Sequence, residues 1–147
     1  MGEKSAQKRK YIVETARGVF VEKGYKDVTM KDIVDACKIS RGGLYLYFAS
    51  TEEIFMDVLK MEAEEADDVF AGKVREDASP SDILALFLKE QKKEMLFKRN
   101  SLTKAVYEYY FEKKVPKKDN PLKLQFDAAV KIIERLIDAG IEAGEFY

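Results

Sequence analysis

The residues best suited to chemistry lie between Thr29 and Phe48, where an arginine is followed by two glycines. The planar guanidinium of Arg41 can donate two hydrogen bonds to O6 and N7 of a guanine base. Gly42 and Gly43 carry no side chain, so a helix that contains them can approach a binding partner closely. A thin, polar helix end of this kind is typical of a segment that enters the major groove of DNA.

Two short helices separated by a turn are expected to position these residues. Thr29 can cap the first helix, and Asp32, three residues later, completes a pattern like a capping box. Apolar residues then recur at i, i+3, i+4 and i+7, which predicts one buried helix face. These residues are Met30, Ile33, Val34 and Cys37.

The second helix is predicted to begin after Ser40, which can cap it. Leu44 and Phe48 lie four residues apart and are expected to anchor one side of this helix, away from Arg41. A first helix buried on one side, followed by a helix whose N-terminus is free, is what a helix-turn-helix DNA-binding motif requires.

The order and spacing of four segments resemble the TetR family of transcription regulators. In that family a first helix is followed by a threonine-capped second helix and a serine-capped recognition helix. The resemblance covers about the first sixty residues of the chain. The matching segments are A-R-G-V-F-V-E-K-G-Y (16–25), V-T-M-K-D-I-V (28–34), I-S-R-G-G-L-Y-L-Y-F (39–48) and T-E-E-I-F-M-D-V-L (51–59).

The resemblance implies which residues contact DNA. Arg41 is expected to read a base, and Lys31, Tyr45 and Tyr47 match family positions that contact DNA, largely at phosphates. Packing of Tyr45 against the first helix is the structural alternative for that residue. The expected DNA-binding residues are Thr29, Lys31, Ser40, Arg41, Gly42, Gly43, Tyr45 and Tyr47.

Three positions depart from the family pattern. Lys38 lies in a turn that usually carries glycine, so the lysine implies either modest strain or a different turn. Tyr47 replaces a common histidine, and Thr51 replaces a lysine that often contacts a phosphate. The last two changes predict fewer charge-assisted contacts with the DNA backbone.

The composition argues against an enzyme. The chain has 147 residues, 46% of them hydrophobic, with no histidine and one cysteine. The lack of histidine removes the commonest general base and the commonest transition-metal ligand, and one cysteine makes neither an internal disulfide nor a zinc cluster. No P-loop or G-x-G-x-x-G motif occurs. We therefore expect no cofactor and no metal site, and we expect Cys37 to be inert core.

Charge is distributed unevenly. Residues 1–51 carry ten Lys/Arg and six Asp/Glu, whereas residues 52–147 carry sixteen and twenty-one. A basic first third fits a DNA-facing end, although chance in a charged, soluble protein would give the same pattern. The sequence has no apolar run of about eighteen residues and no secretory signal, which predicts a cytoplasmic protein that does not contact a membrane.

Helical periodicity extends through the chain, and no strand pattern competes with it. We predict an all-α fold: a three-helix DNA-binding domain with a helix-turn-helix at residues 1–50, followed by an antiparallel helical ligand-binding bundle at residues 51–147. Because family members usually carry two further helices that form a dimer, the resemblance implies that the second domain lacks its C-terminal end. Helices outside the motif are predicted over about 4–23, 51–72, 80–98, 101–114 and 121–142.

The resemblance also implies a function. It predicts a ligand-responsive transcriptional repressor that binds a palindromic DNA operator as a homodimer and is released by a small, largely apolar effector. Two alternatives stay open. One is a helical protein-interaction module that has lost strong DNA binding, and the other is a small enzyme or carrier that uses a cavity within the predicted helical bundle. Candidate effector-binding residues, which ordinary core packing would also explain, are Phe87, Met95, Tyr107, Tyr110, Phe111 and Phe126.

Overall fold

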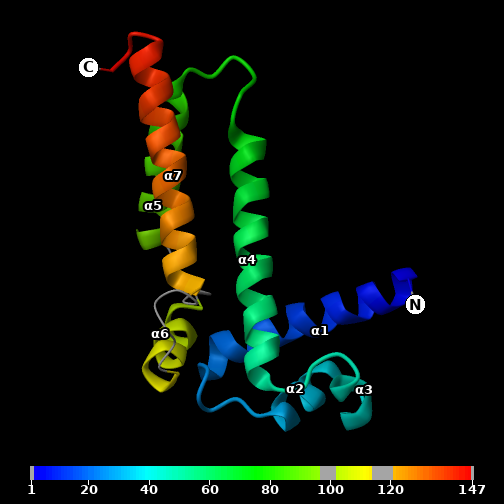
Figure 1. The fold of residues 1–147 in the computed structure, drawn as a ribbon. Helices are drawn as coiled ribbons and strands as arrows, with labels where there is room; N and C mark the ends of the chain where they lie inside the picture. The colour runs from blue at the N-terminus through cyan, green and yellow to red at the C-terminus, as the bar shows by residue number, and fades with distance from the viewer. Residues whose placement is uncertain (1, 97–101, 114–120, 147) are drawn as a thin grey trace. The chain divides into compact units, whose positions relative to one another are not determined.

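The computed structural model describes residues 2–96, 102–113 and 121–146, without the side chains of 94–96, 121–126 and 128. All regular structure in these ranges is α-helical, which confirms the predicted all-α class (Figure 1). Outside the helix-turn-helix, the observed helix ends agree with the predicted ones to within about two residues, and the ends predicted at Lys98, Ser101 and Lys114 lie outside the described residues. The second helix of the motif, predicted to include Phe48, ends at Tyr45. The helices are α1 (Gly2–Lys23), α2 (Met30–Cys37), α3 (Arg41–Tyr45), α4 (Thr51–Lys73), α5 (Pro80–Leu96), α6 (Thr103–Glu112) and α7 (Pro121–Glu142).

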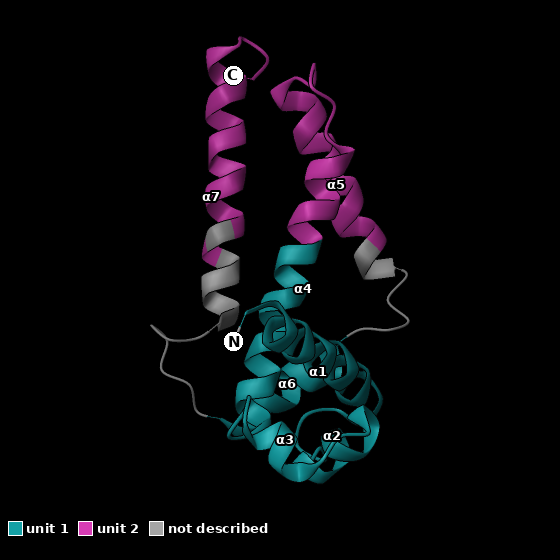
Figure 2. Cartoon of the chain, turned by 90° about the vertical axis from the view of Figure 1, so that its right-hand side faces the viewer, with its two compact units in different colours: residues 1–65, 100–114 teal, residues 66–99, 115–147 magenta. Residues whose placement is uncertain are grey.

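The helices divide between two compact units (Figure 2). Unit 1 comprises Met1–Glu65 and Asn100–Lys114, and unit 2 comprises Ala66–Arg99 and Val115–Tyr147. α6 therefore belongs to the same unit as the helix-turn-helix, although a long stretch of sequence separates them. The division of the chain at residue 50 stays a prediction.

The hydrophobic core of the described residues lies in unit 1, which contains all their buried hydrophobic side chains. α1 contributes Ile12, Ala16 and Phe20 from one stripe, as its periodicity predicts. The ring centroids of Phe20 and Phe55 are 4.9 Å apart in an edge-to-face arrangement, and Tyr109 of α6 lies 5.4 Å from Phe55. Aromatic pairs of this kind add about 0.5–1.5 kcal/mol beyond the burial of their area. The rings therefore hold α6 in the same core as α1 and α4.

A carboxylate of α6 binds the turn that follows α1. Oε2 of Glu108 accepts hydrogen bonds from the backbone N–H groups of Tyr25 and Lys26, each at 3.2 Å. Gly24 ends α1 with a φ of 86°, which is typical of a C-terminal cap, and a Cβ atom there would lie 2.5 Å from Oε1 of Glu108. Glycine is needed at this position because of both the positive φ and the close approach of the carboxylate.

A second group of polar contacts links α6 to the start of α4. Nζ of Lys113 lies 3.0 Å from Oε2 of Glu52, and the hydroxyl of Tyr109 donates to Oε1 of Glu52 at 3.4 Å. The hydrogen bond to Glu52 raises the pKa of Lys113 above its usual value. Burial, followed by the nearby charge of Glu52, raises the pKa of the Tyr109 hydroxyl, so that tyrosine stays protonated.

In unit 2, α5 and α7 pack side by side and run in opposite directions, as expected for an antiparallel bundle (Figure 1). The N–H of Ser81 at the start of α5 donates to Glu145, beyond the end of α7, at 3.0 Å. Gly144 has a φ of 77°, and the N–H of Phe146 donates to the carbonyl of Gly140 at 3.1 Å. The Phe146 ring occupies the space that a side chain at Gly140 would need. Gly144 therefore closes the end of α7.

Candidate nucleic-acid interface

The helix-turn-helix begins with a reciprocal cap at α2. Oγ1 of Thr29 accepts a hydrogen bond from the N–H of Asp32 at 3.2 Å, and the Asp32 carboxylate accepts one from the N–H of Thr29 at 2.9 Å. This is the predicted capping box. The Thr29 N–H, and then Lys23 with its Nζ 3.2 Å away, hold the pKa of Asp32 below its usual value.

The turn between α2 and α3 contains a lysine in the left-handed region. Lys38 has φ 55° and ψ 42°, and its N–H donates to the carbonyl of Val34. A residue with a Cβ atom is strained by roughly 1–2 kcal/mol in this conformation, so the strained alternative predicted from sequence is the one observed. The hydroxyl of Tyr11 donates to the Cys37 carbonyl at 3.0 Å and holds the end of α2. Burial raises the pKa of the Cys37 thiol, which fits an inert core residue.

α3 is a single short helix whose direction is set by its cap and its anchors. Oγ of Ser40 accepts a hydrogen bond from the N–H of Gly43 at 2.9 Å, which confirms the predicted cap. Leu44 and Phe48 are fully buried in the core of unit 1. Because these two residues lie on one side of the backbone, the opposite side of α3 must face solvent.

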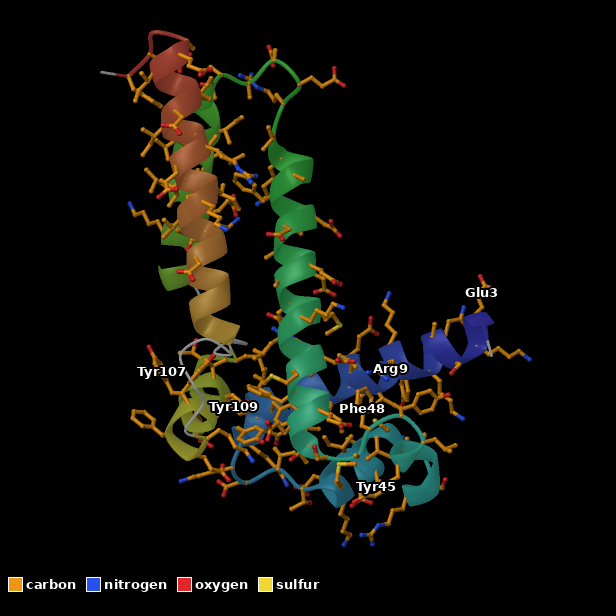
Figure 3. The ribbon with its side chains drawn as sticks, viewed as in Figure 1. Glu3, Arg9, Tyr45, Phe48, Tyr107 and Tyr109 are labelled. Atoms are coloured by element: carbon orange, nitrogen blue, oxygen red, sulfur yellow. The ribbon has the colours of Figure 1, made fainter. Side chains whose placement is uncertain are left out.

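The exposed side of α3 carries Arg41, the residue expected to read a base. Arg41 is exposed, and its guanidinium carbon lies 5.7 Å from the centroid of the Tyr45 ring, a cation–π distance. Tyr45 is 43% exposed, so part of its ring is open to solvent (Figure 3). The contact orients the guanidinium while leaving its N–H groups available to a partner. Of the expected DNA-binding residues, Thr29, Lys31, Ser40, Arg41, Gly42 and Tyr45 are exposed, and Gly43 and Tyr47 are half-buried.

Tyr47 is partly engaged within unit 1. Its hydroxyl accepts a hydrogen bond from Oγ of Ser5 at 3.4 Å, and its carbonyl accepts one from Arg9 at 3.4 Å. Arg9 also lies 4.4 Å from the centroid of the Phe48 ring and binds the Asp57 carboxylate at 2.7 Å (Figure 3). Arg9 thus connects α1, the segment after α3, and α4. No local sequence pattern reveals these contacts, because the residues that Arg9 joins are distant in the sequence.

The candidate effector-binding residues fall in both units. Tyr107, Tyr110 and Phe111 belong to α6 in unit 1, where Tyr107 is 59% exposed and Phe111 is 87% exposed. The ring of Tyr110 packs against Tyr109 at 5.5 Å. In unit 2, Phe87 is half-buried and packs edge-to-face against Phe70 at 6.0 Å. The side chains of Met95 and Phe126 lie outside the described residues.

The described ranges hold no group of three or more Cys, Asp or Glu side chains arranged to bind a metal ion. None of the helices they contain has the length and apolar character needed to cross a membrane.

Comparison with known proteins agrees with this geometry. Residues 12–58 match the family described as bacterial regulatory proteins, tetR family, and residues 83–147 match the tetracyclin repressor-like C-terminal domain. A transcriptional regulator of the TetR/AcrR family from Thermobifida fusca has the same fold, with a TM-score of 0.69 at 24% identity. That likeness covers 96% of this chain and 74% of the solved one.

Two curated relatives illustrate the extent of the similarity. The HTH-type transcriptional regulator YfiR of Bacillus subtilis is 31% identical over 139 residues, which are 92% of this chain and 66% of YfiR. The HTH-type transcriptional repressor AcnR of Corynebacterium glutamicum is 32% identical over 62 residues, which are 42% of this chain and 33% of AcnR. The chain therefore spans only part of the length of either relative. The relatives are transcriptional regulators and not enzymes, and this chain belongs to the TetR family of bacterial regulatory proteins.

Proposed function

We propose that this chain is the DNA-binding and effector-binding part of a transcriptional regulator, and that α3 is its recognition helix. The observation that carries the proposal is the two-sidedness of α3. Leu44 is fully buried on one side, while Arg41, Gly42 and Tyr45 face solvent on the other. A helix held in this way can enter the major groove without disturbing the core that supports it.

Each exposed residue has a distinct role in the proposal. The fork of Arg41 donates to O6 and N7 of a guanine, the contact that best distinguishes guanine from the other bases. Gly42 has no heavy atom within 4 Å of the position of a Cβ, so the backbone can approach the base edges. Lys31 is exposed on α2 and contacts a phosphate, which positions the protein without reading sequence.

The remaining parts of the proposal follow from family membership. Two copies present their recognition helices about 34 Å apart, one turn of DNA, to a palindromic operator in the cytoplasm. AcnR is a repressor, and we assign the same direction of regulation to this chain. The edge-to-face pair of Phe70 and Phe87 in unit 2 supports a small, largely apolar effector.

Selection of duplexes from a random pool by the full chain, followed by gel-shift titration at two salt concentrations, tests the proposal. We expect sequence-selective binding and a log–log salt slope near −0.9 for each phosphate contacted. Arg41→Ala should cost about 1–3 kcal/mol of binding free energy and relax the preference at one base. Lys31→Ala should weaken binding to all sequences alike and reduce the salt slope by about 1. Arg75→Ala, which removes an arginine of unit 2, is the matched control and should bind like the wild type.

Two outcomes would count against the proposal. Binding that is absent, or that is independent of salt, would instead favour a protein-interaction module. An Arg41→Ala variant with the same base preference as the wild type would remove Arg41 as the base-reading residue.

A further inference from the structure

Leu46, directly after α3, is a large apolar side chain left in solvent. It is 83% exposed, although Leu44 and Phe48 on either side are fully buried. The backbone of Leu46 is helical, with φ −64° and ψ −29°, and its N–H donates to the carbonyl of Gly42 at 3.1 Å. The helical backbone therefore fixes the direction in which the Leu46 side chain points.

The register directs Leu46 to the same side as Gly42. Successive helical residues are turned by about 100°, so Gly42 and Leu46, each two residues from Leu44, both point away from the core. Gly42 presents only backbone, with open space beyond it. The outermost surface of α3 thus combines bare backbone at one end with one aliphatic side chain at the other.

The helix-turn-helix that carries this aliphatic side chain also carries exposed cations. Arg41 lies on α3, Lys31 on α2 and Lys38 in the turn, and all three are exposed. Positive charge exposed on this motif is complementary to DNA phosphates. An apolar group on the same motif then needs an apolar partner within the groove.

The major groove offers one such group. The base edges there present hydrogen-bond donors and acceptors, except for the C5-methyl group of thymine. A leucine side chain has neither donor nor acceptor, so it cannot recognise the polar groups. We propose that Leu46 is a specificity-determining residue that selects thymine by contact with its C5-methyl group, beside the base read by Arg41. This inference rests on the proposed function, because it requires α3 to enter the major groove.

The test replaces single thymines by deoxyuridine in the duplex that the full chain selects, since deoxyuridine lacks the methyl group and keeps every hydrogen-bonding atom. At one position in each half-site, the replacement should weaken binding of the wild type about fourfold. This figure corresponds to roughly 0.8 kcal/mol for a buried methylene-sized group, with 1.4 kcal/mol for each factor of ten. Leu46→Ala should bind the thymine and deoxyuridine duplexes equally.

Two further variants complete the design. Leu46→Met keeps a long apolar side chain and should retain part of the discrimination against deoxyuridine. Leu88→Ala removes an exposed leucine of α5 and should discriminate as the wild type does. Circular dichroism should show that all three variants keep the helical content of the wild type, because neither leucine belongs to the core.

The outcomes separate this inference from the function beneath it. If the chain selects a duplex but no thymine position responds to deoxyuridine, the contact by Leu46 is wrong and the proposed function stands. The same conclusion follows if Leu46→Ala responds as strongly as the wild type. If the chain selects no duplex at all, the proposed function fails and this contact fails with it.

Discussion

Replacing Glu108 by alanine should loosen the turn that connects α1 to the helix-turn-helix. The carboxylate accepts two backbone hydrogen bonds, from Tyr25 and Lys26, at 3.2 Å each. Hydrogen bonds to a charged group contribute about 1.5–3 kcal/mol each, but Lys26 is exposed and water can replace part of its bond. We therefore expect Glu108→Ala to cost about 2–3 kcal/mol of unfolding free energy, and Glu108→Gln, which keeps one acceptor oxygen, to cost about half of that.

Amide hydrogen exchange of the full chain is the sharpest assay, because the Tyr25 and Lys26 N–H groups both donate to Glu108. Their exchange should accelerate in Glu108→Ala while the amides within α1 keep their protection. Lys104→Ala is the control, since Lys104 is itself exposed and contacts Glu108 through an i,i+4 ion pair at 3.8 Å. That variant should change stability by no more than about 0.5 kcal/mol.

A double-mutant cycle adds an independent readout. Gly24→Ala should destabilise the fold for two reasons: the positive φ of 86°, and the collision of the new Cβ with Glu108. In the Glu108→Ala background only the penalty from φ persists, so the second substitution should cost less there. If Gly24→Ala costs the same unfolding free energy in both backgrounds, and amide exchange at Tyr25 and Lys26 is unchanged, the proposed stabilisation of this turn by Glu108 is wrong.

Three further predictions concern stability, each measured as unfolding free energy from urea titrations. Lys38→Gly should stabilise the chain by about 0.5–1 kcal/mol, because relief of left-handed strain exceeds the entropy that glycine loses; a destabilised variant would contradict the strain. Phe55→Ala should cost about 3–5 kcal/mol, since that ring is fully buried between those of Phe20 and Tyr109. Phe87→Ala should cost clearly less, because Phe87 is only half-buried. The reverse order of the two costs would show that unit 1 does not hold the main core. Asp32, with its lowered pKa, stabilises the folded state above about pH 4, and this contribution is lost as the pH falls through its folded-state pKa. Asp32→Asn should therefore lose less stability between pH 7 and pH 3 than the wild type does, and an identical loss would exclude the contribution.

The sequence predicts the local features of the recognition motif well. Thr29 and Ser40 are caps, and Leu44 is an anchor, because capping and helical periodicity act between residues a few positions apart. The strain at Lys38 was predictable for the same reason, since glycine is the residue suited to that turn.

Contacts between distant segments could not be predicted in this way. Arg9 binds Asp57, and Glu108 binds the turn at Tyr25, across 48 and 83 residues of sequence. Neither pair shares a helix or a turn, so no periodicity joins its members. The sequence predicts a helix at α6 but does not reveal which of its sides meets the rest of unit 1. The burial of Tyr109 and the exposure of Phe111 became evident only from the fold.

The central claim is that Arg41 at the tip of α3 reads guanine in the major groove. Its most direct test is to replace each guanine of the selected duplex, one at a time, by 7-deazaguanine, which removes the N7 acceptor and leaves base pairing intact. The wild type should lose affinity at one guanine in each half-site, by up to about tenfold, which is half of the roughly 1–3 kcal/mol expected for the two-bond contact of Arg41, and Arg41→Ala should be indifferent to that replacement. Equal sensitivity of both proteins at every guanine, or no sensitivity of the wild type anywhere, would contradict the assignment of α3 as a recognition helix led by Arg41.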